Sequence, residues 1–350
     1  MKTILGTLPA SPSSSSSLPP PLPPYCGTEE GSKIWYNTND PSAMVLSGAV
    51  WVMIIFSMVV CAQVILLQPY GPQINKYLSY AVLFACFMGW FSHAVCMLSD
   101  PGVIPSDAKP LSSRSSSFAS YNKDEIGNEY LGTGSSDDKT SHDNIIKDEL
   151  YGMRNNGSSN NLTATMIGDE ENLVEPLQHV MCGMCDGYKP PFAHHDRMSG
   201  RCISRMDHFC PWTNNAIGAK NQKSFILFVT YTNIASWIFC LILYINWMSC
   251  SSVSCSKDPR HKTILQVQVI VLIFSVIFTT SMLVTQIYSL MTGIGTIDRM
   301  QMRRNQADSY QPIPFNHVFG DETPYRWFLP TEPHFDDPEA VLLYRRTSGW

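Results

Sequence analysis

The sequence predicts a membrane all-α fold, with four transmembrane helices and a small cytosolic cysteine-rich domain between the second and the third helix. The first observation behind this prediction is that four stretches of the 350-residue chain contain no Asp, Glu, Lys or Arg: 41–75, 77–99, 224–256 and 263–297. Each stretch is long enough for a membrane-spanning helix, which needs about 20 apolar residues. The second observation is that a polar segment between the second and the third stretch holds four of the 11 cysteines.

The four helices are predicted over about 43–67, 77–98, 225–248 and 264–291. The first pair therefore occupies 43–98, and the second pair occupies 224–292. Stretches that contain Pro and Gly follow the first helix at 69–72 and the second helix at 100–102. Both residue types end helices and form turns, so they support these boundaries.

The remaining segments are predicted to lie in the cytosol. Residues 1–42 form a disordered tail with a Pro- and Ser-rich tract, and residues 99–177 form a disordered linker that begins with Asp-Pro-Gly. The cysteine-rich domain covers 178–223, and 293–350 form a C-terminal segment. Four spans place both termini on one side. Lys and Arg are more frequent near the membrane on that side, as expected for the cytosolic face.

A first group of residues in the cysteine-rich segment has the spacing of metal ligands. Cys182 and Cys185 form a Cys-x-x-Cys pair, which can hold one metal ion from a tight turn. Tetrahedral zinc needs two more ligands, which Cys202 and either His194 or His195 can supply. The alternative is a redox pair or a set of unbound thiols, and the lack of a thioredoxin-like strand and helix pattern disfavours redox chemistry. We therefore predict a structural zinc site.

A second group places an acid, a base and a thiol within four residues, Asp207-His208-Phe209-Cys210. A thiol is nucleophilic as its thiolate, and a neighbouring imidazole can take its proton while a carboxylate orients the ring. The alternative is that these residues are zinc ligands or solvated loop residues. Because Cys210 closely precedes the third helix, we expect it at the cytosolic membrane surface. A substrate with a polar head and a membrane-buried tail would meet it there.

The whole segment is similar to the cysteine-rich domain of the DHHC palmitoyltransferases, which ends in Asp-His-His-Cys. The matching residues are Cys182, Cys185, Lys189-Pro190-Pro191, His194-His195, Cys202, Met206-Asp207-His208, Cys210-Pro211-Trp212, Asn214-Asn215, Gly218, Asn221 and Phe225. Outside this segment, three stretches resemble further motifs that the family carries in the same order: Asp100-Pro101-Gly102, Gly295-Thr296-Ile297-Asp298 and 316–330.

The resemblance implies a protein S-acyltransferase. Cys210 would take a long-chain acyl group from acyl-CoA, the co-substrate, and pass it to a cysteine of a membrane-associated substrate protein. His208 would act as the general base, and Asp207 would orient it. The expected surroundings are a bilayer of the Golgi, the endoplasmic reticulum or the plasma membrane. Nucleic acid is not an expected partner, because the chain has no basic cluster with interleaved aromatic residues.

Members of this family bind two zinc ions, each through three Cys and one His. One ligand set maps to Cys182, Cys185, His195 and Cys202 and is complete. The other set maps to positions that hold neither Cys nor His here, namely Asp196, Ser199, Phe209 and Ala216. The resemblance therefore implies one structural zinc ion. The loss of the second set leaves a catalytically silent, zinc-containing membrane adaptor as the alternative function. A transporter or channel is disfavoured, because the spans contain no charged residues.

Overall fold

The computed structural model describes residues 34–62, 73–111, 181–250, 259–301 and 312–347. Its long helices are α1 (Pro41–Val60), α2 (Gln73–Leu98), α3 (Gln222–Cys250) and α4 (Pro259–Thr292). All four are long and apolar enough to cross a membrane, so the predicted four-span, all-α fold with a cysteine-rich domain after the second span is confirmed. The predicted end of the first helix at residue 67, most of the predicted tail 1–42 and most of the linker 99–177 lie outside the described residues.

Local capping chemistry sets the helix ends. The Asp40 carboxylate accepts hydrogen bonds from the backbone N–H groups of Ser42 and Ala43, so α1 begins slightly before its predicted start. Proline in the first turn favours the same start, because its missing N–H has no helical partner there. α4 likewise begins at a proline, and Gly293, with a φ of 74°, follows its last residue.

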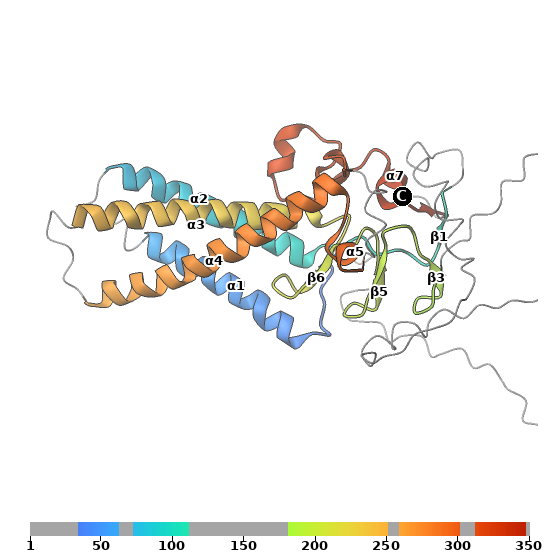
Figure 1. Ribbon diagram of the computed structural model, residues 1–350, viewed down its shortest axis with the longest axis horizontal. Coiled ribbons are helices and arrows are strands. Elements are labelled where there is room, and N and C mark those ends of the chain that lie inside the picture. Colours follow the sequence, from blue (N-terminus) through green and yellow to red (C-terminus); the bar gives the residue numbers. More distant parts are fainter. Residues whose placement is uncertain (1–33, 63–72, 112–180, 251–258, 302–311, 348–350) are drawn as a thin grey trace, which may run out of the picture.

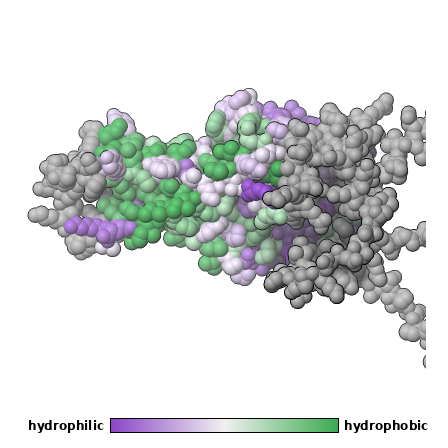
Figure 2. Space-filling model, viewed as in Figure 1, coloured by the Kyte–Doolittle hydropathy of each residue, from purple (hydrophilic) through white to green (hydrophobic). Residues whose placement is uncertain are grey.

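The four long helices lie side by side, and the strand-rich domain lies beyond one end of them (Figure 1). At this end α1 begins, α2 ends, α3 begins and α4 ends, so all four helices lead directly into the domain region. Hydrophobic residues cover much of the visible surface of the helices, whereas hydrophilic residues gather toward the domain (Figure 2). A multi-pass membrane protein has this arrangement, because lipid contacts the apolar helices and water contacts the polar domain.

Short antiparallel hairpins build the cysteine-rich domain. The pairs are β2 (Met181–Cys182) with β3 (Gly187–Tyr188), β4 (His194–Asp196) with β5 (Arg201–Ile203), and β6 (His208–Cys210) with β7 (Asn215–Ile217). An isolated two-stranded hairpin is only marginally stable in water. These hairpins therefore depend on packing against their neighbours.

The C-terminal segment packs back on this domain. Its elements are α5 (Thr296–Gln301), α6 (Asn316–Phe319), the 3₁₀ helix η4 (Pro324–Phe328), α7 (Pro338–Leu342) and β8 (Arg345–Arg346). β8 pairs with β1 (Ala108–Lys109), which follows α2 in the chain. The Ser204 hydroxyl also donates a 2.8 Å hydrogen bond to the carbonyl oxygen of Leu342. The end of the chain thus holds the domain and the segment after α2 together.

The turn at Asp100-Pro101-Gly102 joins α2 to the domain. One carboxylate oxygen of Asp100 accepts a 2.9 Å hydrogen bond from the N–H of Gly102, and the other lies 3.2 Å from Nζ of Lys220. The N–H of Ser204, which follows β5, donates to the carbonyl of Gly102 at 2.8 Å. The φ of 106° at Gly102 is a backbone conformation that glycine adopts without strain. This turn therefore fixes the end of α2 against the hairpins.

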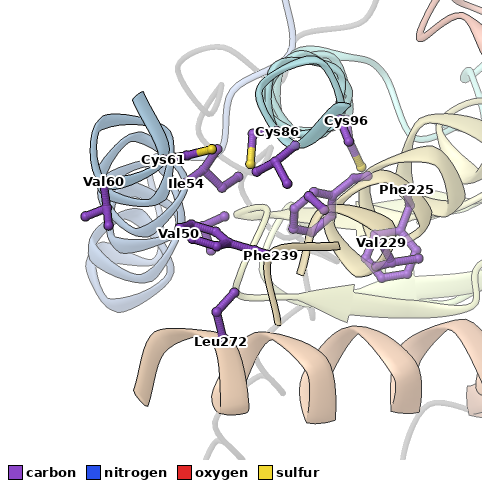
Figure 3. Packing of buried hydrophobic residues seen from close by; sticks show 14 of the residues in the cluster. Val50, Ile54, Val60, Cys61, Cys86, Cys96, Phe225, Val229, Phe239 and Leu272 are labelled. Carbon is purple, nitrogen blue, oxygen red and sulfur yellow. The ribbon is translucent and has the colours of Figure 1, made fainter. Parts of the chain in front are cut away.

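A large apolar cluster connects the helices to the domain. It contains residues of all four long helices, together with Cys210 and Ile217 of the β6–β7 hairpin. Figure 3 shows how side chains from α1, α3 and α4 meet in it, among them Val50, Ile54, Phe225, Phe239 and Leu272. Because it belongs to this cluster, Cys210 lies at the boundary between the helical bundle and the domain.

Candidate active site and metal centre

The predicted metal ligands converge from two hairpins. Cys182 ends β2, Cys185 lies in the turn that follows, His195 is on β4, and Cys202 lies opposite His195 on β5. Their ligand atoms all lie within 4.8 Å of one another. The Nδ1 atom of His195 is 3.2 Å from Sγ of Cys185, 3.7 Å from Sγ of Cys182 and 4.0 Å from Sγ of Cys202. The four residues thus form a single cluster that could hold a metal ion.

The geometry and the charge of this cluster fit zinc. Zn–S bonds of about 2.3 Å and Zn–N bonds of about 2.0 Å place tetrahedral ligand atoms about 3.5–3.8 Å apart, and the sulfurs of Cys185 and Cys202 are 3.7 Å apart. The contact between the two sulfurs lowers the pKa of Cys185 to about 4, whereas the same contact raises the pKa of Cys202. Three neighbouring thiols cannot all ionise unless a cation balances them, and a divalent metal supplies that charge.

His194, the other histidine that the sequence offered as a ligand, points away from the cluster. Its Nε2 atom lies 2.8 Å from a carboxylate oxygen of Asp298 in α5. Successive side chains of a strand point to opposite faces, so His194 and His195 on β4 cannot serve the same site. Of these two residues, His195 joins the cysteines, and His194 links the hairpin to α5.

The positions of the missing second zinc set are filled by hydrogen bonds and apolar packing. The Asp196 carboxylate accepts a 2.9 Å hydrogen bond from the N–H of Ser199, and both residues are buried. Phe209 lies opposite Ala216 across β6 and β7, and both pack in an apolar cluster with Ile203. Among the residues that the structure describes, the cluster around His195 is the single Cys- and His-based group close enough to bind a metal.

The base and the thiol lie on β6, and the acid, Asp207, directly precedes this strand. The Nδ1 atom of His208 lies 2.7 Å from a carboxylate oxygen of Asp207. His208 and Cys210 lie two residues apart on the strand, so they share one face, and Phe209 points to the other. Cys210 is 2% exposed and Asp207 is 3% exposed. Strand alternation therefore brings the thiol and the imidazole together in a site shielded from water.

Electrostatics in this site favour a thiolate. Burial alone would raise the pKa of Cys210, but its interaction with His208 outweighs burial and holds that pKa below its ordinary value. Burial alone would lower the pKa of His208, yet the hydrogen bond to Asp207 and the nearby thiol raise it to about 10. Since Nδ1 of His208 is bonded to Asp207, its buried Nε2 atom is the one left to interact with the Cys210 thiol. That atom is therefore available to exchange a proton with a reacting group.

Residues far away in the sequence hold Asp207 in place. Gln286 of α4 donates a 2.9 Å hydrogen bond to its carboxylate, and Thr296 of α5 donates through its N–H at 2.8 Å and its hydroxyl at 3.2 Å. These bonds and His208 together outweigh burial and lower the pKa of Asp207. The sequence singled out Thr296 only as part of a motif shared with the family, and it did not single out Gln286. The available signal for Gln286 was a polar side chain near the end of a predicted span.

Comparison with known proteins agrees with this geometry. A model of the DHHC palmitoyltransferase family matches residues 175–303, which include the metal cluster, Cys210 and the last two spans. Residues 175–303 therefore make up a DHHC palmitoyltransferase domain. Palmitoyltransferase ZDHHC3 of Rattus norvegicus is 26% identical over 323 residues, which cover 89% of this chain and 86% of the relative.

Two further relatives match this chain over shorter regions. Palmitoyltransferase ZDHHC3 of Homo sapiens is 32% identical over 157 residues, which cover 43% of this chain and 52% of the relative. Probable protein S-acyltransferase 13 of Arabidopsis thaliana is 28% identical over 170 residues, which cover 46% of this chain and 55% of the relative. In both alignments the chain spans about half the length of the relative.

This chain has Phe209 where the motif that names the family has its second histidine. The phenyl ring packs with Met206 and Ile297 on the face of β6 opposite Cys210. The replacement therefore leaves the contacts of Asp207 and His208 intact. In physical terms, an apolar side chain takes over the packing role that a metal ligand would have at this position.

The pH dependence of Cys210 alkylation tests these electrostatics. Because His208 lowers the pKa of Cys210, we expect its reaction rate with iodoacetamide to rise with pH around a midpoint below that of an ordinary thiol, about 8.5. In the Asp207→Asn variant the imidazolium loses its carboxylate, so the midpoint should move to higher pH. Mass spectrometry of the Cys210 peptide provides the rates. An unchanged midpoint in both Asp207→Asn and His208→Ala would contradict the interpretation.

Proposed function

We propose that this chain is a protein S-palmitoyltransferase that moves a long-chain acyl group from acyl-CoA to Cys210 and then to a cysteine of a membrane-associated protein. The observation that carries the proposal is the buried group of Cys210, His208 and Asp207 at the boundary of the helical bundle. No observation on the described residues favours the silent adaptor, because all three groups needed for thiol chemistry are in contact or on one face of β6.

In the first step, the Cys210 thiolate attacks the thioester carbonyl of acyl-CoA, and its proton resides on His208. A new bond forms between the carbonyl carbon and Sγ, and the bond to the CoA sulfur breaks. His208 then returns its proton to the leaving thiolate, so free CoA departs as a thiol. Asp207 stabilises the imidazolium and keeps Nδ1 protonated, which leaves Nε2 to transfer the proton.

In the second step, a cysteine of the substrate protein reacts with the acyl-enzyme. His208 takes the proton of that thiol, and the resulting thiolate attacks the carbonyl carbon on Cys210. The bond to Sγ breaks, and Cys210 leaves as the stabilised thiolate with which the cycle began. The low pKa of Cys210 thus assists both the attack and the departure, because a thiol of lower pKa is a better leaving group.

The acyl chain would lie among the helices. A cavity of about 50 Å³ extends between α1, α3 and α4, with Trp212 among its lining residues. Ala235 and Ser236 of α3 and Ser275 of α4 form part of its wall, and such small side chains leave room for a hydrocarbon chain. This cavity and Cys210 both adjoin the large apolar cluster, so the acyl group could reach the thiol while its tail stays in the membrane.

A zinc ion would be held by Cys182, Cys185, His195 and Cys202. It would stabilise the domain and take no part in the acyl transfer. The complete ligand set leaves no open coordination position for substrate. Its role would be to join the β2–β3 hairpin to the β4–β5 hairpin. His194 of the β4–β5 hairpin bonds to Asp298 of α5, and Thr296 of α5 bonds to Asp207. The zinc site would therefore stabilise the position of Asp207 through α5.

Self-acylation of the purified chain tests the function. In detergent micelles with labelled palmitoyl-CoA, the chain should acquire label that neutral hydroxylamine removes, because hydroxylamine cleaves thioesters. Release of CoA should accompany this labelling in equal amount. A chain with its full metal content that releases no CoA and takes up no label would overturn the proposal.

The expected orientation places the domain in the cytosol, where acyl-CoA is available. Met300 of α5 is 73% exposed on the domain side, and Lys262 is exposed near the start of α4 at the other end. In cells, Met300→Cys should react with an impermeant maleimide as soon as the plasma membrane is permeabilised. Lys262→Cys should react in intact cells if the protein is in the plasma membrane, and only after detergent opens the organelles if it is in the Golgi or endoplasmic reticulum. The reverse pattern would invert the topology.

A further inference from the structure

His93 of α2 connects the first span to the loop that follows Cys210. The residue is 0% exposed and lies inside a membrane-spanning helix. Its Nδ1 atom accepts a 2.8 Å hydrogen bond from the indole N–H of Trp51 in α1. Its Nε2 atom lies 2.7 Å from the backbone carbonyl oxygen of Trp212. The mechanism proposed above uses none of these contacts.

The partners of His93 determine its protonation state. An indole N–H can only donate, so Nδ1 must accept and carries no proton. A carbonyl oxygen can only accept, so Nε2 must carry the proton that forms the second bond. His93 is therefore a neutral imidazole in one tautomer, and Trp51 selects that tautomer. The edge of the ring also packs against Phe228 of α3, with ring centroids 4.9 Å apart.

The contact with Trp212 acts on the segment that carries the nucleophile. Trp212 follows Cys210 after one proline, whose ring restricts the backbone. Thr213 donates from its N–H to the Cys210 carbonyl at 3.1 Å and closes this short turn. A change at the Trp212 carbonyl therefore moves Cys210 as well, because few free dihedral angles separate them.

The Trp212 side chain also lies beside the acyl cavity. Its ring is 5.7 Å from that of Phe274 and 5.2 Å from that of Phe278, both in α4, and all three rings line the cavity. The His93 imidazole thus holds the backbone carbonyl of Trp212. The position of this residue affects both the Cys210 thiol and the cavity wall that the Trp212 ring forms. The donor to this carbonyl, His93, is completely buried, so its loss would leave a buried carbonyl without a partner at a large cost.

We infer that His93 is a positioning residue that sets the alignment between Cys210 and the acyl cavity. The inference rests on the proposed acyltransferase function. Asp207 and His208 hold Cys210 from the domain side, and His93 holds the same loop from the membrane side. A long-chain substrate needs both the thiol and the cavity at once, whereas a small thiol reagent needs the thiol alone.

Three variants separate this role from a general role in folding. His93→Phe keeps an aromatic ring and removes both hydrogen bonds. His93→Gln restores a donor that reaches the position of Nε2 and can again bond to the Trp212 carbonyl. Ser92→Ala is the matched control, because Ser92 is equally buried on α2 and its hydroxyl donates within the helix, to Met88. Each variant is assayed for palmitoyl-CoA self-acylation and for iodoacetamide alkylation of Cys210.

We expect His93→Phe to slow self-acylation about 10–100-fold, the cost of a small misplacement of reacting groups. Its alkylation rate should stay within about threefold of the parent chain, since the activation by His208 is untouched. His93→Gln should recover most of the acylation rate, and Ser92→Ala should match the parent. Equal acylation by His93→Phe and the parent would overturn the inference alone. Parallel loss of both rates, not recovered by His93→Gln, would show a folding role instead. If the parent itself does not self-acylate, the proposed function fails with it.

Discussion

Substitution Cys210→Ser is expected to abolish the hydroxylamine-sensitive labelling of the chain by palmitoyl-CoA. Cys210 is the one cysteine in direct electrostatic contact with His208 among the described residues, and that contact lowers its pKa. A serine hydroxyl in the same place ionises far less readily, so it is a poor nucleophile at neutral pH. The measurement is the label on the purified variant, with CoA release as a second readout that does not depend on the stability of the product.

The neighbouring Cys96 provides a matched control. It lies on α2, is fully buried and belongs to the same apolar cluster as Cys210. Cys96→Ala should keep the label, because no base supports its thiol. Undiminished labelling of Cys210→Ser would identify another cysteine as the acceptor and would remove the proposed mechanism.

His208→Ala should reduce self-acylation by about 10²–10⁴-fold, which is the usual contribution of a positioned general base. Some reaction should remain, because the thiol and the cavity are still present. Raising the pH should partly restore the rate, since a higher pH forms the thiolate without help from the imidazole. A rate within a few fold of the parent chain would show that His208 does not act on the thiol.

We also expect the chain to bind one zinc ion. Elemental analysis of the purified protein should find a zinc-to-protein ratio near one. Cys182→Ala and Cys202→Ala should lose this zinc and unfold the hairpins. Structural zinc contributes on the order of 10 kcal/mol of folding free energy in small domains. Because α5 holds both His194 and Asp207, loss of the metal should also silence Cys210, although neither substituted residue takes part in the chemistry.

Asp196→Asn is the control for the metal experiment. Asp196 occupies a position of the replaced second ligand set, and it caps the turn at Ser199 rather than facing a metal cluster. An asparagine oxygen can accept the same hydrogen bond, so both zinc content and activity should be unchanged. Two zinc ions per chain would show that a further ligand set exists. A fully active chain without zinc would remove the structural role of the cluster.

The sequence by itself determined the spans and the two chemical clusters. Membrane-spanning helices are recognised from about 20 apolar residues in a row, a property of each segment alone, and each predicted span overlaps a long apolar helix of the structure. The Cys-x-x-Cys spacing and the Asp207-His208-Phe209-Cys210 stretch are also local. They predicted which residues would lie near one another, because chain neighbours and hairpin partners must meet in space.

Contacts that depend on which faces of the helices and strands meet are visible only in the tertiary structure. The sequence offered His194 and His195 as equivalent ligands, and only the pairing of β4 with β5 separates them. In the sequence, Gln286 and His93 are polar residues within apolar segments and have no evident partner. In the packed structure, Gln286 bonds to Asp207 and His93 bonds to the Trp212 carbonyl. The physical reason is that hydropathy measures how much a segment prefers lipid, whereas the rotation of a helix about its axis depends on its neighbours. These residues acquire their partners only when all four helices and the domain pack together.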